Sequence, residues 1–155
     1  MGFDREAVSA EAIGRLRSAR LPQLEALLEA NDLPTDDCAE QAENFYGIVE
    51  QDRLIAAGGL QPAGEYYLLR SLVVDEAWRG RGLARALTEF LLARAEKAGS
   101  PAVYLLTETA ADYFARLGFE SVKREQVPAA IRQTRQFASL CPQDARCMVI
   151  GLPRG

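Results

Sequence analysis

The stretch LLRSLVVDEAWRGRGLARALTEFLL, residues 68–92, decides the fold. It opens on an apolar run, residues 68–74, that only one Arg and one Ser interrupt, and such a run predicts a strand covered on both faces. A polar turn then leads into the tetrad RGRG at residues 79–82. From residue 83 onward, leucines and a phenylalanine recur at helical spacing. The stretch therefore predicts a strand, a glycine-rich basic loop and a helix, in that order.

The junction between this loop and this helix suits an anion. The first turn of a helix has backbone N–H groups without intrahelical acceptors and carries the positive end of the helix dipole. Gly80 and Gly82 have no Cβ, so a ligand can approach the backbone closely. Arg79, Arg81 and Arg85 add charge that suits phosphate oxygens. Because arginines at a helix start are unfavourable without an anion, the pattern predicts a diphosphate-bearing cofactor rather than a surface helix that binds nothing.

Three other anion-binding motifs fit this loop less well. No Lys-Ser or Lys-Thr follows the second glycine, which argues against a P-loop. Arg85 stands where the dinucleotide fingerprint has a third Gly or Ala. The RGRG tetrad occurs once, between two apolar elements, whereas disordered RNA-binding segments repeat it.

Composition sets ordinary limits. A chain of 155 residues with 48% hydrophobic and 26% charged residues predicts one globular domain, residues 1–155. The net charge of -4 argues against general nucleic-acid binding. No apolar run approaches the roughly 20 residues that span a bilayer, and the N-terminus is unlike a signal peptide, so we expect a cytoplasmic protein without a membrane partner.

The remaining segments predict a mixed α/β sheet. Before the central strand we expect strands at residues 12–17, 44–50 and 54–60, a helix that opens at Pro22, and a short helix that Thr35 caps and that runs to Ala42. After the long helix we expect strands at residues 103–106, 119–123 and 147–150 and helices at residues 109–117 and 128–139. Strands first in an antiparallel meander and then alternating with helices are typical of this fold class.

Two motifs carry a family resemblance. The pattern RxxGxA at residues 79–84, after the LVV strand end at residues 72–74, resembles the acetyl-CoA pyrophosphate loop of the GNAT superfamily of N-acetyltransferases. The segment FARLGF at residues 114–119 resembles a second signature of that family, the Tyr-x-x-x-Gly-Phe helix end. The resemblance covers about residues 45–123. It implies the GNAT fold and an N-acetyltransferase that uses acetyl-CoA and no metal.

The resemblance also implies where acetyl-CoA would bind. The backbone of residues 72–74 would bind the pantetheine arm, and residues 79–84 would bind the pyrophosphate. The predicted cofactor-binding residues are Leu72, Val73, Val74, Arg79, Gly80, Arg81, Gly82, Leu83, Ala84, Thr107 and Phe114. A deprotonated substrate amine would attack the thioester carbonyl, and backbone N–H groups near Leu72 would stabilise the oxyanion.

The catalytic acid and base depart from the family pattern. Phe114 stands where the family often has a general-acid Tyr, and Tyr113 is one residue, about 100°, around the helix. A thiol of pKa about 8.5 leaves fairly well as a thiolate, so the change need not abolish catalysis. The chain has no His, which leaves Glu65, Glu108 or a water relayed by a backbone carbonyl as the base. The predicted catalytic residues are Leu72, Tyr113 and Glu108.

Arg70 is the main candidate for substrate binding. A charge inside a buried strand is costly unless it has a partner. That partner is either a substrate carboxylate, gripped bidentately, or a structural acidic side chain. Ser71 and Arg132 complete the predicted substrate-binding set, and Arg135 lies on the same expected helix as Arg132.

Finer resemblances bear on the acceptor. The C-terminal third, with LRSL at residues 69–72, resembles acetyltransferases of arsenic-resistance operons, and YLLT at residues 104–107 with ADYF at residues 111–114 resembles the acetyltransferase domain of N-acetylglutamate synthases. Both imply a small-molecule amine as acceptor, namely an amino acid or an amino-acid-like arsenical or phosphinic analogue. A protein or peptide acceptor, a non-catalytic acyl-CoA sensor and a homodimer remain open alternatives.

The three cysteines are expected to be free thiols. The spacing of Cys38, Cys141 and Cys147 fits no standard zinc pattern, so we expect no resident metal. A trivalent arsenic site made of the three thiolates is the alternative.

Overall fold

The computed structural model describes residues 12–140 and 144–154. The described residues form two compact units, each with its own core. The N-terminal unit contains residues 12–59 and 71–91, and the C-terminal unit contains residues 60–70, 92–140 and 144–154.

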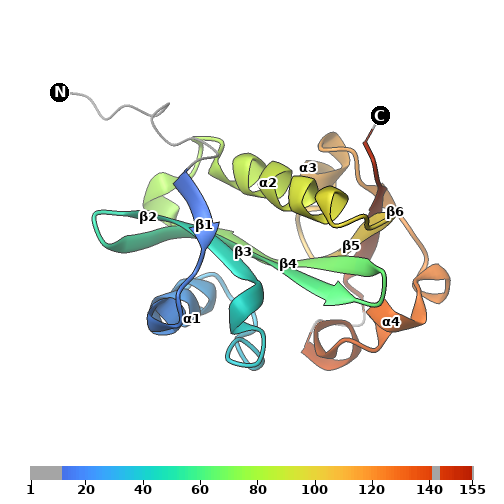
Figure 1. Ribbon diagram of the computed structural model, residues 1–155, viewed down its shortest axis with the longest axis horizontal. Helices are drawn as coiled ribbons and strands as arrows, with labels where there is room; N and C mark the ends of the chain where they lie inside the picture. The colour runs from blue at the N-terminus through green and yellow to red at the C-terminus, as the bar shows by residue number, and fades with distance from the viewer. Residues whose placement is uncertain (1–11, 141–143, 155) are drawn as a thin grey trace. The chain divides into compact units, whose positions relative to one another are not determined.

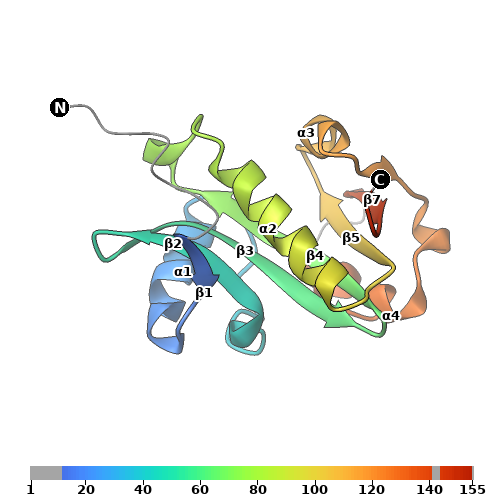
Figure 2. The same ribbon diagram turned by 45° about the horizontal axis from the view of Figure 1, so that its top comes forward.

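A mixed seven-stranded sheet is the framework of the fold (Figures 1 and 2), with the strand order β1-β2-β3-β4-β5-β7-β6. The strands are β1 (Ile13–Arg15), β2 (Phe45–Glu50), β3 (Arg53–Ala63), β4 (Tyr66–Val74), β5 (Ala102–Thr107), β6 (Glu120–Ser121) and β7 (Arg146–Gly151). The pairs β1–β2, β2–β3, β5–β7 and β6–β7 are antiparallel, whereas β4 and β5 are parallel. The prediction of a mixed α/β fold is confirmed.

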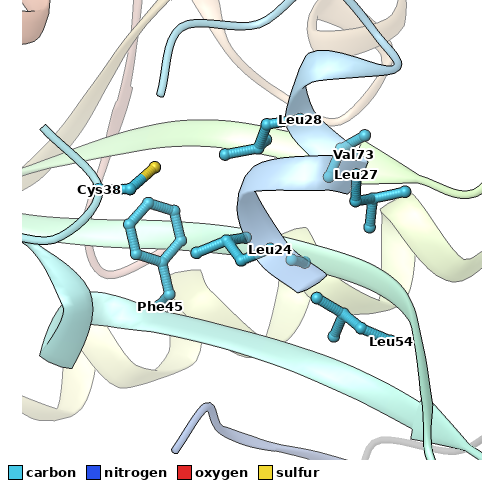
Figure 3. Packing of buried hydrophobic residues seen from close by; sticks show 8 residues of the cluster. Leu24, Leu27, Leu28, Cys38, Phe45, Leu54 and Val73 are labelled. Carbon is cyan, nitrogen blue, oxygen red and sulfur yellow. The ribbon is translucent and has the colours of Figure 1, made fainter. Parts of the chain in front are cut away.

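In the N-terminal unit, helices cover both faces of β2 and β3. Phe45 and Tyr46 are successive strand residues, so their side chains point to opposite faces. Phe45 belongs to the cluster around α1 (Leu21–Glu29), whereas the Tyr46 ring lies 5.7 Å from that of Phe90 on α2 (Leu83–Lys97). The α1 cluster (Figure 3) consists of Leu24, Leu27, Leu28, Cys38, Phe45, Leu54, Ala57 and Val73. Gly47 is required in β2 because a Cβ there would lie 2.6 Å from the carbonyl oxygen of Ala56.

The C-terminal unit has a second core on one face of β4, β5 and β7. Its buried members are Ala63, Leu68, Val127, Ile131, Phe137 and Cys147. The short helix α4 (Ala129–Arg132) contributes Ile131, which is fully buried. Helix α3 (Ala111–Arg116) packs through Phe114, whose ring lies 5.6 Å from that of Phe119. Gly118, with φ +106°, ends this helix as predicted.

Two predicted helices are wrong in part. Residues 36–41 form turns and Ala42–Asn44 a 3-10 helix, because hydrogen bonds of three- and four-residue spacing alternate there instead of a regular helical series. The helix expected at residues 128–139 is divided into α4 and a π-helix, Gln136–Leu140. Thr134 lies at the break, where its Oγ1 donates to the Ile131 carbonyl (2.7 Å) and accepts from the Phe137 N–H (3.2 Å). A hydroxyl that bonds to the backbone competes with the helical pattern.

Strand boundaries differ more modestly. β3 extends to Ala63 and β4 starts at Tyr66, so both are longer than expected, and the two-residue turn Gly64–Glu65 joins them. β1 and β6 are shorter, at three and two residues. β6 ends early because the chain turns after Val122, whose N–H donates to the Cys147 carbonyl, into a 3-10 helix, Arg124–Gln126.

Candidate functional site

β4 is irregular where the predicted chemistry begins. Ser71 is buried and has φ +56°, in the left-handed region that a non-glycine residue rarely adopts. Such a residue costs on the order of 1–3 kcal/mol and persists only where its surroundings hold it. It also interrupts the regular ladder of a strand. The peptide groups of Leu72, which is half-buried, therefore follow directly on a break in the strand geometry.

The turn after β4 is fixed by Asp75. Its Oδ1 accepts a hydrogen bond from the Ala77 N–H (2.9 Å) and caps the 3-10 helix Glu76–Trp78. Its Oδ2 accepts from Arg53 (2.8 Å), and its own N–H donates to the Ile55 carbonyl (2.8 Å). These contacts hold the start of the basic loop against β3.

The two glycines of the basic loop are required by backbone conformation. Gly80 and Gly82 have φ +79° and +78°, and a Cβ built at either would meet no described atom within 4 Å. Open space therefore lies beside the loop backbone. The helix that follows makes its first internal hydrogen bond from the Ala86 N–H to the Gly82 carbonyl (3.0 Å), so the N–H groups of Leu83 and Ala84 precede that bond.

Contacts with neutral groups orient Arg79 and Arg81, and Arg85 forms an ion pair with Glu89 (3.9 Å). Arg79 donates through Nε to the Val74 carbonyl (3.2 Å) and through Nη2 to Oδ1 of Asn31. The Arg81 guanidinium stacks on the Trp78 ring, 4.7 Å from its centroid. The first turn of α2 contains no acidic residue. The loop thus presents oriented positive charge beside helix N–H groups for which residues 12–140 and 144–154 offer no backbone acceptor, which is the geometry that binds phosphate.

In the C-terminal unit, Arg70 is a buried cation with a fixed orientation. Only 3% of its surface is exposed, and its Nη1 donates to Oε1 of Gln61 (3.0 Å), which is also buried. Arg70 lies two residues after Leu68, so both side chains leave the same face of β4. The guanidinium therefore lies on the face that carries the second core.

The predicted residues around α3 have different surroundings. Thr107 uses its Oγ1 to accept the Ala110 N–H (3.0 Å) and so holds the loop after β5. Glu108 in that loop is exposed. The half-buried Tyr113 ring lies 5.4 Å from the Phe114 ring, and the Arg116 guanidinium lies 6.0 Å from Tyr113. Only 7% of the Phe114 surface is exposed, so its ring is packed inside the protein and contacts little solvent.

The remaining candidates are a cation and the thiols. Arg132 is exposed at the last residue of α4. Cys38 is buried in the N-terminal unit and Cys147 in the C-terminal unit, whereas Cys141 lies outside the described residues. Burial raises the pKa of the Cys147 thiol, and nearby Arg124 partly opposes the rise.

The part of the chain that the structure describes shows neither a metal-binding cluster nor a membrane-spanning helix. Residues 12–140 and 144–154 hold no group of three or more His, Cys, Asp or Glu side chains that could bind a metal ion. Within the same residues, no helix has both the length and the apolar character for a membrane crossing.

Three residues that contribute to these sites, Asn31, Gln61 and Trp78, were not predicted from the sequence. Asn31 is 48 residues from Arg79, and nothing in the local sequence connects them. Gln61 contacts Arg70 across the β3–β4 turn. Trp78 had a signal, since an aromatic residue directly before a basic loop can stack on one of its cations.

Several solved structures share this fold. A protein from Mycobacterium tuberculosis, Rv2747, in complex with CoA and a second ligand is 21% identical with a TM-score of 0.76, over 90% of this chain and 98% of that one. N-acetylglutamate synthase from Neisseria gonorrhoeae, complexed with coenzyme A and N-acetyl-glutamate, is 16% identical with a TM-score of 0.80, over 92% of this chain and 35% of that one. The ribosomal-protein-S18-alanine N-acetyltransferase from Escherichia coli is 22% identical with a TM-score of 0.70, over 92% and 94%.

The sequence itself decides the family. The model of the acetyltransferase (GNAT) family matches residues 12–119, which is more than half of the chain and includes both motifs. This match confirms the predicted class of enzyme, an N-acetyltransferase that takes its acetyl group from acetyl-CoA. The chain belongs to the acetyltransferase (GNAT) family.

Proposed function

We propose that this protein transfers the acetyl group of acetyl-CoA to the amino group of a small amino acid or amino-acid-like compound. The orientation of buried Arg70 by the neutral Gln61 amide is the observation that carries the choice of acceptor. A guanidinium so held suits a carboxylate, and it suits the oxyanion of an arsenical or phosphinic analogue for the same reason.

The features of the basic loop support acetyl-CoA as the acetyl donor. Residues 79–84 combine two left-handed glycines, open space beside the backbone, the N–H groups of the first turn of α2 and oriented arginines. These features suit the pyrophosphate of acetyl-CoA. The solved structures from M. tuberculosis and N. gonorrhoeae, which hold CoA on the same fold, support this assignment.

Fold likeness alone does not choose the acceptor. The similar structures include a synthase of N-acetylglutamate and an enzyme that acetylates an alanine of a ribosomal protein, so the same fold serves small and large acceptors. Arg70 favours the small acceptor, because a buried cation selects a compact anionic group. A basic peptide would instead be repelled by it.

The proposed reaction needs few protein groups. The neutral amine attacks the thioester carbonyl, the C–N bond forms, and backbone N–H groups near Leu72 stabilise the tetrahedral oxyanion. The C–S bond then breaks, the CoA thiolate leaves, and the amine proton passes to a base through water. Exposed Glu108 is the proposed base and Tyr113 an auxiliary acid; Phe114 cannot donate a proton.

Thiol release from acetyl-CoA tests the proposal. The panel should contain glutamate, aspartate and other amino acids, phosphinic and arsenical amino-acid analogues, the decarboxylated amines that match them, and basic peptides. Turnover with a carboxylate-bearing or oxyanion-bearing amine, and not with its decarboxylated partner, supports the proposal. Turnover with peptides alone would overturn the acceptor assignment. Binding of acetyl-CoA without any turnover would instead favour a sensor.

A further inference from the structure

The end of α1 reaches the basic loop through one side chain. Asn31 lies two residues after the last residue of α1, Glu29, and its Oδ1 accepts a hydrogen bond from Nη2 of Arg79. Arg79 is also bonded through Nε to the Val74 carbonyl (3.2 Å). Two nitrogens of the guanidinium are therefore fixed by groups of the N-terminal unit, and no described group accepts a hydrogen bond from the third, Nη1.

The Asn31 amide is itself locked. Its Nδ2 donates to the Leu27 carbonyl (2.9 Å), and its backbone N–H donates to the Leu28 carbonyl (3.0 Å). Because Nδ2 is engaged at the helix, Oδ1 has to face outward to Arg79. Leu27 and Leu28 are buried in the core around α1. Thus a side chain that is hydrogen-bonded to two residues of the buried core orients an exposed arginine.

The neutrality of Asn31 matters as much as its position. A free arginine loses up to about 2 kcal/mol of rotamer entropy when it is ordered by a ligand, and a tether removes part of that cost before binding. A carboxylate at the same place would also accept a hydrogen bond from Arg79, although it could not donate to the Leu27 carbonyl. It would also cancel the positive charge that attracts phosphate. An amide orders the cation and leaves its charge for an anion.

We propose that Asn31 is a positioning residue for acetyl-CoA, which holds Arg79 ready for the pyrophosphate. The proposal rests on the proposed binding of acetyl-CoA by residues 79–84. According to this proposal, Asn31 raises the affinity for acetyl-CoA. We expect it to have no role in the chemical step of acetyl transfer.

The experiment compares Asn31→Ala with Asn31→Asp in the full chain. CoA binding is measured by calorimetry at low salt, and kcat/KM is measured with acetyl-CoA and with S-acetyl-pantetheine, which lacks the pyrophosphate. Asn44→Ala is the matched control, because Asn44 is a half-buried amide of the same unit whose Nδ2 bonds to Gln41 (2.7 Å) far along the chain from the loop. Arg79→Ala alone and combined with Asn31→Ala completes a double-mutant cycle.

We expect Asn31→Ala to weaken CoA binding by about three- to tenfold, the effect of one hydrogen bond, with kcat and the use of S-acetyl-pantetheine unchanged. The effect should vanish in the Arg79→Ala background. Asn31→Asp keeps an oxygen for Arg79, loses the donor to the Leu27 carbonyl and adds a negative charge just past the end of α1, so it should melt slightly lower than the parent and bind CoA at least as weakly as Asn31→Ala. Asn44→Ala should bind CoA normally.

Three results would overturn the inference. These are equal losses with both donors, additive losses with Arg79→Ala, and parental affinity in Asn31→Asp. If Asn31→Ala fails to fold, the Asp variant still decides, since it keeps the oxygen that Arg79 bonds. Failure of the unaltered chain to bind CoA would defeat the proposed donor site itself, whereas binding that ignores Asn31 defeats only this inference.

Discussion

The basic loop of the N-terminal unit is continuous in sequence, whereas the candidate acceptor residues of the C-terminal unit come from separate segments. Residues 79–84 carry glycine torsions, helix N–H groups and cations within six positions. Arg70 depends instead on Gln61, and Arg132 lies on a helix that Thr134 interrupts. A site that binds phosphate through backbone groups can be encoded by one short segment of the sequence. A site that binds an acceptor through side chains depends on contacts between residues that are distant in the sequence. The first should tolerate side-chain changes better than the second.

The largest effect is expected at Arg70. Arg70→Lys keeps the charge and loses the planar fork, so the acceptor KM should rise by roughly 10- to 100-fold, the value of one or two charge-assisted hydrogen bonds. The KM for acetyl-CoA and the melting temperature should change little. Steady-state kinetics with the best acceptor of the panel provides the measurement. An unchanged acceptor KM would make Arg70 a structural residue. The C-terminal unit would then lack its proposed acceptor-binding cation, and the contrast with the phosphate-binding loop of the N-terminal unit would not hold.

A smaller effect on the other substrate is expected at Gly82. Gly82→Ala places a Cβ where φ is +78°, which costs about 1–2 kcal/mol of backbone strain, although the Cβ itself would meet no described atom. The loop should shift, and the KM for acetyl-CoA should rise about tenfold while the acceptor KM is kept. Arg85→Ala is the control, because it alters a side chain of the first turn and leaves the backbone alone. A larger loss in Arg85→Ala than in Gly82→Ala would show that side chains, and not backbone, bind the phosphate.

The same contrast explains what could be predicted from the sequence. The strand, loop and helix of residues 68–92 were predicted because their pattern is local, as was the end of α3 at Gly118. The π-helix after α4 was not, because the hydroxyl of Thr134 satisfies backbone groups that a helix would otherwise pair. Asn31 was missed for a related reason, since its partner is distant in the chain. Backbone conformation that depends on neighbouring residues can be predicted from the sequence, whereas side-chain pairs between distant residues are seen only in the folded structure.

A still smaller effect is expected at Tyr113. Tyr113→Phe should leave kcat within about tenfold, because a full general-acid contribution is about a hundredfold or more and the CoA thiol is a good leaving group. The half-buried Tyr113 ring packs on Phe114, so the change removes only the hydroxyl. Single-turnover rates would separate the chemical step from product release. A drop beyond a hundredfold would make Tyr113 the acid and would give the C-terminal unit a catalytic role beyond acceptor binding.

The smallest effect concerns stability at high pH and belongs to the second core. Burial, and then repulsion from Tyr66, raises the pKa of Tyr104 above its ordinary 10.0, and burial raises that of Cys147 above 9.0. The folded state thus holds these protons more tightly than the unfolded state, so their contribution to stability is complete below about pH 9 and is lost as the pH rises through the folded pKa values.

In urea titrations from pH 8 to 11, Tyr104→Phe should flatten the decline of the unfolding midpoint, and Tyr67→Phe serves as the control for loss of a phenol. Since the core around α1 contains neither group, the loss at high pH should start in the C-terminal unit, where hydrogen exchange at β5 and β7 would detect it. Equal flattening in both variants would mean that the alkaline loss is general and not a property of this core.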